Sequence, residues 1–185
     1  MTIYGLICRF KFILMKKKFQ SIGRLSYIFD PLQIDNPSSI SIGIGSYIAA
    51  KSWLMGGVSN NTTLKIGNNV SIGHFCHIIG CFDVTIENDV LFADKVFVTD
   101  NTHCFKNPKI PIKDQKIEKI GNVKIGEGSW ICENVCILGV SVGKHSVIGA
   151  NSVVTTDIPD YSVAVGIPAR VIKKYNFDTK EWESV

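Results

Sequence analysis

The chain has 185 residues, of which 45% are hydrophobic and 19% charged, enough apolar material for one folded domain and too much for a disordered protein. The formal net charge is +4, and much of the excess lies in Arg9, Lys11 and residues 16–18. This is a local patch, so we expect no nucleic-acid partner. No apolar run approaches the roughly 20 residues of a membrane-spanning helix, which excludes a multi-pass membrane protein.

The first 39 residues are expected to form a basic and apolar lead-in to the main domain. Their opening, MTIYGLICRFKFILMKKKF, interleaves apolar residues with cations. Two arrangements fit this pattern. The segment lies on an anionic membrane surface, or it forms a short helix that packs on its own domain. The sequence leaves both open.

The cysteine pattern and the N-terminus indicate the compartment. The chain shows no repeated CxxC pair, and no signal-peptide cleavage pattern follows the N-terminal segment. We therefore expect a cytoplasmic protein, with the inner face of the membrane as an alternative site, and reduced thiols. The thiols are Cys8, Cys76, Cys81, Cys104, Cys132 and Cys136.

A period of six residues runs through most of residues 40–160. Helices require apolar residues at spacings of three and four, and half-buried strands require alternation, so neither explains this period. A very short strand followed by a corner explains it, and three such units close one coil of a solenoid. The in-phase residues are Ile42, Ile48, Leu54, Ile66, Ile72, Ile78, Ile86, Phe92, Val98, Ile125, Ile131, Ile137, Val142, Ile148 and Val154.

Interruptions of the period predict features outside the coils. The spacing lengthens by two residues between Ile78 and Ile86, which indicates a small bulge. The largest interruption covers residues 100–121, where Pro108, Pro111 and many charges break the pattern. We expect a loop there that protrudes from the solenoid.

The repeat resembles that of the hexapeptide-repeat family, whose members fold as left-handed parallel β-helices and are mostly acyltransferases. The resemblance implies an all-β fold, with a left-handed β-helix over residues 40–172 and homotrimers with active sites between subunits. The stretch from Ile125 to Lys174 is similar to the acetyl-CoA-binding end of xenobiotic, maltose, galactoside and polysaccharide acetyltransferases. It implies acetyl-CoA as the co-substrate.

The protruding loop opens with VFVTDNTH, and His103 resembles the loop histidine that serves as the catalytic base in relatives. Acyl transfer to a hydroxyl needs a group that removes the hydroxyl proton, and imidazole does this near neutral pH. We expect Asp100 or a backbone carbonyl to hold the other ring nitrogen. The alternative is a solvated histidine without a role. We expect the adjacent Cys104 to be structural.

Residues of the C-terminal half match positions near the cofactor in relatives. Trp130 resembles an aromatic that packs along the cofactor channel, although it also suits an outer coil face. Gly149 and Ala150 match small residues beside the pantetheine arm. Basic residues at the end of the repeat are placed to meet the phosphates of coenzyme A, or they form a solvated face. They are Arg170, Lys173 and Lys174.

The last segment and the remaining histidines give two further expectations. Asp178 followed by Glu181 is typical of a helix cap, so we expect a short C-terminal helix within residues 173–185. His74 and His77 raise the alternative of a zinc site like that of carbonic anhydrases with this fold. Their spacing does not match that group, and we expect no metal.

These features together predict an acetyl-CoA-dependent O-acetyltransferase. We expect its acceptor to be a sugar hydroxyl of a bacterial surface polysaccharide or of a precursor. One alternative is an N-acetyltransferase acting on an amino sugar. The other is a β-helix protein without transferase activity, either zinc-binding or structural.

Overall fold

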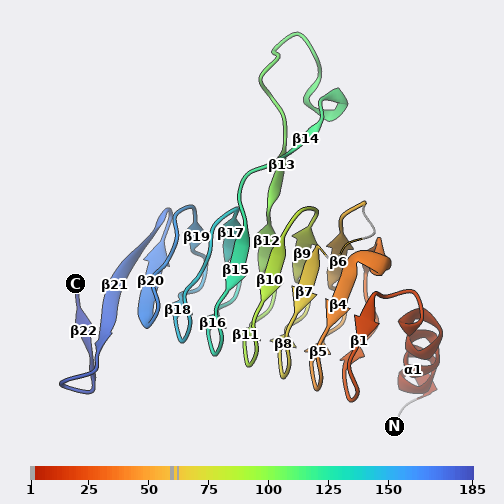
Figure 1. Ribbon diagram of the computed structural model, residues 1–185, viewed down its shortest axis with the longest axis horizontal. Coiled ribbons are helices and arrows are strands. Elements are labelled where there is room, and N and C mark those ends of the chain that lie inside the picture. The colour runs from red at the N-terminus through yellow and green to blue at the C-terminus, as the bar shows by residue number, and fades with distance from the viewer. Residues whose placement is uncertain (1–2, 59–60, 62) are drawn as a thin grey trace.

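Three sheets form the faces of a solenoid in the computed structural model, which describes residues 3–58, 61 and 63–185 (Figure 1). The first sheet contains β1 (Ser21–Ile22), β4 (Ile40–Ile42), β7 (Leu64–Ile66), β10 (Val84–Ile86) and β15 (Val123–Ile125). The second contains β2 (Tyr27–Ile28), β5 (Tyr47–Ile48), β8 (Ser71–Ile72), β11 (Leu91–Phe92), β16 (Trp130–Ile131), β18 (Val147–Ile148), β20 (Ser162–Gly166), β21 (Ala169–Asn176) and β22 (Glu181–Ser184). The third contains β3 (Gln33–Asp35), β6 (Trp53–Gly56), β9 (His77–Gly80), β12 (Phe97–Thr99), β17 (Cys136–Leu138) and β19 (Val153–Val154).

The chain visits the three sheets in turn, and each circuit makes one coil. The solenoid has about seven coils and fits the expected left-handed parallel β-helix. All strand pairs between successive coils are parallel, and only β20, β21 and β22 pair antiparallel within the second sheet. The predicted fold class is confirmed.

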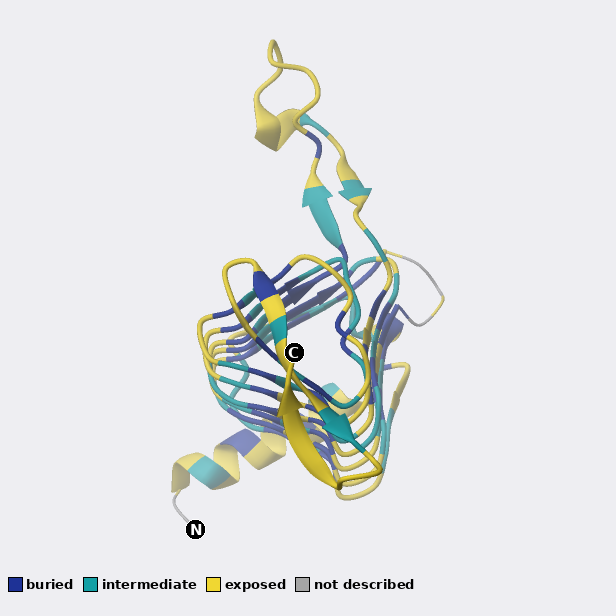
Figure 2. Cartoon of the chain, turned by 90° about the vertical axis from the view of Figure 1, so that its left-hand side faces the viewer, coloured by how far each residue is buried: buried dark blue, intermediate teal, exposed yellow. Residues whose placement is uncertain are grey.

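The in-phase residues of the six-residue repeat form the core. Every one of them is buried, and buried residues recur along the walls of the solenoid in the view of Figure 2. They stack in register: Ile48 pairs with Ile72, Ile72 with Phe92, and Phe92 with Ile131. Each coil therefore buries its aliphatic side chains only by contact with its neighbours.

Buried serines bond the backbone at one corner of the coils. The Ser46 hydroxyl donates to the Gly67 carbonyl at 2.7 Å and accepts the Val70 N–H at 3.0 Å. The Ser129 hydroxyl repeats this arrangement, donating to the Gly143 carbonyl at 2.7 Å and accepting the Ser146 N–H at 3.1 Å. Because buried backbone groups need partners, these small polar residues suit the interior of the corner better than another aliphatic residue.

The solenoid begins earlier than residue 40. Strands β1, β2 and β3 pair in register with β4, β5 and β6, so residues 21–35 form a complete first coil. A short 3₁₀ helix, η1 (Pro37–Ser39), separates it from the second coil. The predicted boundary between lead-in and β-helix was therefore wrong, because the first coil carries the same period at Ile22, Ile28 and Ile34.

The lead-in proper is the helix α1 (Ile3–Lys16), which lies beside β1 at the N-terminal end of the solenoid (Figure 1). Its Cys8 and Phe12 are buried, and the Phe12 ring meets the Tyr27 ring edge-on at 5.0 Å. Of the two arrangements that the sequence left open, the structure shows the segment as a short helix packed on its own domain. Among the described residues, no helix has the length and apolar character required to cross a membrane.

The C-terminal residues form a hairpin, and the predicted C-terminal helix was wrong. Strand β21 pairs antiparallel with β20 and β22 with β21. The Asn176 side chain accepts the N–H groups of Asp178 and Thr179, at 2.9 and 3.4 Å, which makes a tight turn where a helix cap was expected. Packing of the Tyr175 ring against the Trp182 ring, 5.4 Å apart, joins the two strands.

The predicted protruding loop is a hairpin arm. Strands β13 (Asn101–His103) and β14 (Ile117–Lys119) pair antiparallel and project from the solenoid, and the tip carries the 3₁₀ helix η2 (Ile112–Asp114) (Figure 1). At the root the returning chain passes tightly over the next coil, because a Cβ on Gly121 would lie 1.9 Å from the Gly139 carbonyl oxygen. Only glycine fits there.

Removing volume from the core should destabilise the protein strongly. Ile131 is fully buried and stacked between Phe92 and Ile148. We expect Ile131→Ala to lower the free energy of unfolding by about 2–5 kcal/mol in chemical denaturation. Ile44→Ala, on a half-exposed corner residue, serves as the control, with an expected change of about 0.5 kcal/mol or less. Equal losses in the two variants would contradict the stacked core.

Candidate functional site

The arm carries His103 at the end of β13, opposite Ile117 on β14. The His103 side chain is exposed, and its ring makes no hydrogen bond or ion pair with another residue in the part of the chain that the structure describes. The arm leaves the solenoid where the chain passes from the third sheet to the first. His103 is thus held beside the outer face of the third sheet.

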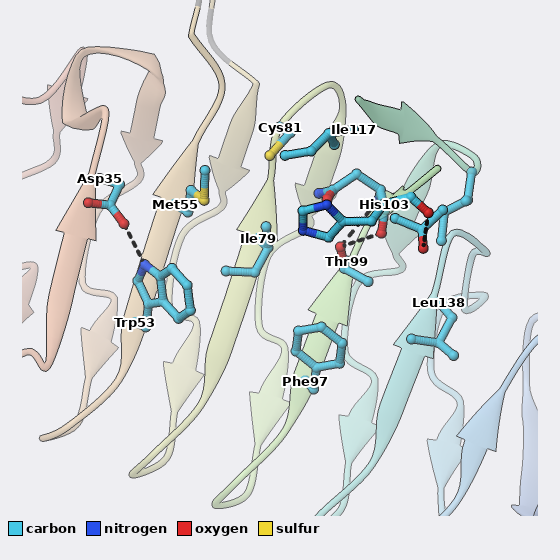
Figure 3. A pocket seen from close by; sticks show the side chains of 13 residues that line it. Asp35, Trp53, Met55, Ile79, Cys81, Phe97, Thr99, His103, Ile117 and Leu138 are labelled. Atoms are coloured by element: carbon cyan, nitrogen blue, oxygen red, sulfur yellow. Dashed lines mark hydrogen bonds between the residues drawn. The ribbon is translucent and has the colours of Figure 1, made fainter. Parts of the chain in front are cut away.

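A groove of about 600 Å³ lies between the arm and this face (Figure 3). Outward-facing side chains of β6, β9, β12 and β17 form its floor, and the arm forms one wall. Polar groups lie at its two ends, with His103 and Asn101 at one and Asp35 at the other. The apolar side chains are Trp53, Met55, Ile79, Phe97, Ile117, Ile120 and Leu138.

Asp100 is fully buried at the root of the arm and does not contact the His103 ring. Its carboxylate accepts the backbone N–H groups of Cys81, Phe82 and Asp83, at 3.1, 2.7 and 2.7 Å, and the Asn101 side-chain amide at 2.9 Å. These donors occupy both oxygens. The expectation that Asp100 orients His103 directly is therefore corrected, since its carboxylate fixes the arm to the corner of the preceding coil.

This corner is the predicted bulge between Ile78 and Ile86. The two extra residues let three successive backbone N–H groups turn toward one point, a geometry that binds anions. The Asp100 carbonyl also accepts the Ile120 N–H of the returning strand at 2.8 Å. Asp100 thus joins the previous coil, the outgoing strand and the returning strand of the arm.

The thiols at the site are poorly suited to act as nucleophiles. Cys81 lines the groove, and burial, with a smaller contribution from the Asp100 charge, raises the pKa of its thiol. A neutral thiol is a weak nucleophile. Cys104 is buried inside the arm, where its backbone N–H donates to the Lys116 carbonyl at 2.8 Å, and all six cysteines are free.

Sequence reasoning missed Asp35 and Trp53 at the far end of the groove. The Trp53 indole N–H donates to the Asp35 carboxylate at 2.7 Å, and the Gln33 amide donates to the same oxygen at 2.7 Å. The other Asp35 oxygen has no such bond to a described side chain. Because Trp53 directly precedes the inward-facing Leu54 and Asp35 directly follows Ile34, the period itself marks both as outward-facing.

The residues expected to bind the cofactor lie on or beside the second sheet, and none of them lines the groove. Trp130 is half-exposed on β16, and a Cβ on Gly149 would lie 2.7 Å from a Val165 methyl group. Val165 in turn pairs with Arg170, which brings Gly149 and Arg170 close together. Ala150 is exposed at the corner after β18. Arg170, Lys173 and Lys174 are exposed on β21 and form no ion pair within the described chain.

The other histidines have local partners. The His74 ring lies 3.3 Å from the Asp94 carboxylate, His77 meets the Trp53 ring at 5.5 Å, and His145 stacks on Tyr161 at 5.5 Å. No group of three or more His, Cys, Asp or Glu side chains among the described residues is arranged to hold a metal ion.

Replacing the Asp100 carboxylate by an amide should loosen the arm. In Asp100→Asn one acceptor oxygen becomes an NH₂ group that faces backbone N–H donors. We expect a loss of stability of about 1–3 kcal/mol, the usual effect of leaving a buried polar group unpaired. Hydrogen exchange should accelerate at the amides of Phe82 and Asp83.

The matched control is Asp114→Asn at the exposed tip of the arm, where the carboxylate pairs with the exposed Lys113. This change should leave stability within about 0.5 kcal/mol of the wild type. Unchanged exchange at Phe82 and Asp83 in Asp100→Asn would show that the carboxylate does not hold the corner.

Known proteins similar to this chain are named acyltransferases. A putative lipopolysaccharide biosynthesis O-acetyl transferase, WbbJ, of Escherichia coli K12 is 44% identical over 124 residues, which cover 63% of this chain and 63% of that protein. The chain spans 47% to 63% of the length of the first curated relatives it matches. No family model matches the sequence.

Solved structures share the fold. AntD, an N-acyltransferase from Bacillus cereus, superposes with a TM-score of 0.73 over 90% of this chain and 89% of its own, at 24% identity, which shows the fold alone. A maltose O-acetyltransferase from Clostridium difficile 630 has a TM-score of 0.57 and 27% identity over 88% of this chain and 73% of that chain. The six-residue repeat, the parallel solenoid and these relatives fit the hexapeptide-repeat acyltransferase family.

Proposed function

We propose that this protein is an acetyl-CoA-dependent O-acetyltransferase that acetylates a sugar hydroxyl of a bacterial surface polysaccharide or its precursor. The observation that carries the proposal is the exposed His103 side chain at the edge of a groove large enough for a small ligand. The similarity to WbbJ, named for lipopolysaccharide biosynthesis, supports the substrate class.

His103 is the general base of the proposed reaction. As the acceptor oxygen attacks the thioester carbonyl carbon, a His103 ring nitrogen takes the hydroxyl proton. The new C–O bond forms, the C–S bond breaks, and the proton passes from the imidazolium to the departing sulfur. The products are the acetyl ester and free coenzyme A. No covalent enzyme intermediate is required, which agrees with the raised pKa of Cys81.

The acyl donor is proposed from the relatives and from the basic C-terminal strand. AntD is described in complex with 3-hydroxybutyryl-CoA. In this chain we assign Arg170, Lys173 and Lys174 to the phosphates of coenzyme A, because exposed cations without ion-pair partners remain available for them. We assign three further residues to the side of the coenzyme A channel: Trp130, Gly149 and Ala150. A CoA thioester donor locates the reaction in the cytoplasm.

The proposed active site needs two subunits. His103 lies beside the third sheet, whereas the residues assigned to coenzyme A belong to the second sheet and none lines the groove. We propose a homotrimer in which the third sheet of one subunit faces the second sheet of the next, because this arrangement would bring the two halves of the site together. The separation of these residues within one chain supports this arrangement.

Replacing the base should remove most of the turnover. With acetyl-CoA and a panel of matched hydroxyl and amino sugars, we expect His103→Ala to lower kcat by about 10²–10⁴-fold while the protein stays folded. His145→Ala, a change at an exposed histidine outside the groove, should keep wild-type turnover. Undiminished turnover in His103→Ala would refute the assigned base, and a preference for amino acceptors would establish N-acetyl transfer.

Mixed oligomers test whether the site is shared. His103→Ala and Arg170→Ala subunits should each have low activity alone. When the two are co-expressed with different tags and purified together, some interfaces combine an intact groove with an intact basic strand. We expect activity to reappear in these mixed oligomers. Failure of any mixed oligomer to exceed the single variants would contradict a site built from two subunits.

A further inference from the structure

Helix α1 has two apolar faces, and the solenoid covers only one of them. The covered face contains Cys8 and Phe12, both buried, with the partly buried Met15 packed against the core. These residues are four and three positions apart, so they lie on one side of the helix. They account for the attachment of α1 to the first coil.

The opposite face is apolar and exposed, and most of α1 has the colour of exposed residues in Figure 2. Its residues also recur at spacings of three and four, and each is substantially exposed: Ile3 is 78% exposed, Phe10 64%, Ile13 62% and Leu14 59%. Leu6 and Ile7 extend the same surface. Scattered exposed apolar residues are common on soluble proteins, but a continuous apolar face along a helix indicates a binding surface.

Cations border this face. Arg9 and Lys11 are exposed on the helix, and residues 16–18 add three exposed lysines at its C-terminal end. The first acidic residue of the chain is Asp30, which is bonded to Tyr4 and to Lys51. Apolar side chains rimmed by cations match the interface of an anionic bilayer, where the side chains enter the acyl region and the cations meet lipid phosphates.

From this arrangement we infer that α1 is a peripheral docking helix for anionic membranes, held to the protein by Cys8 and Phe12 and entering the lipid by its opposite face. A second copy of the chain is less well matched, because the five cations would face their own equivalents across a symmetric contact. The arm and α1 project from opposite sides of the solenoid (Figures 1 and 2). Docking therefore leaves the arm directed away from the lipid.

Flotation of the full-length protein with vesicles tests the inference. We expect binding to vesicles of phosphatidylglycerol and phosphatidylcholine, weaker binding as NaCl is raised, and little binding to pure phosphatidylcholine. The double variant Phe10→Asp with Ile13→Asp should lose binding. Both side chains are exposed, so the variant should fold, which circular dichroism verifies. Val58→Asp, at a 93% exposed apolar residue outside the helix, is the matched control and should bind like the wild type.

Charge variants separate the electrostatic from the apolar contribution. Changing the three lysines of residues 16–18 to glutamine should weaken binding to anionic vesicles roughly fivefold per lysine, and changing them to arginine should preserve it. Two results would overturn the inference: no flotation of the wild type with anionic vesicles, or wild-type flotation of the Phe10→Asp, Ile13→Asp variant. Flotation is measured without substrate, so its outcome is independent of the proposed acetyl transfer.

Discussion

The stacking of one coil's inward aliphatic side chains on the next is the constraint on which the rest of this protein depends. Ile48, Ile72, Phe92 and Ile131 occupy equivalent places in successive coils, and the register of every strand follows from their contact. Since side chains alternate along a strand, a fixed inward set also fixes the outward set. The floor of the groove, with Trp53 and Phe97, is therefore a direct product of the core.

The sequence was sufficient to predict the solenoid, its core and the protruding arm, because each is governed by local spacing. It was less informative at the two ends of the chain. The first coil was missed although Ile22, Ile28 and Ile34 carry the period, because η1 interrupts the phase before Ile42. The C-terminal hairpin was mistaken for a helix because the tight turn depends on the Asn176 side chain and on aromatic contacts between strands. Such contacts are not visible in spacing.

The candidate site was likewise predictable from the sequence only in part. His103 was identifiable because a histidine in a long insertion on a rigid scaffold is conspicuous, and its place beside the groove agrees with that reasoning. The direct pairing of Asp100 with His103 was wrong, since neighbours in sequence need not be neighbours in bonding. The backbone N–H groups that bond the Asp100 carboxylate lie 17 to 19 residues earlier, at a corner where they converge only in the folded coil. The contact of the Asp100 carboxylate with these N–H groups fixes the arm to the preceding coil.

The two ends of a parallel solenoid are open sheet edges, and unprotected edges recruit further strands. Here α1 lies against the first coil, and the antiparallel strands β21 and β22 continue the second sheet beyond the last coil. The outermost strand, β22, also carries Glu181 and Glu183, whose charges discourage another strand from pairing. A chain that ended before β21 would present bare parallel edges at its last coil. Copies of such a chain could associate end to end through these edges. The C-terminal hairpin therefore acts against end-to-end association.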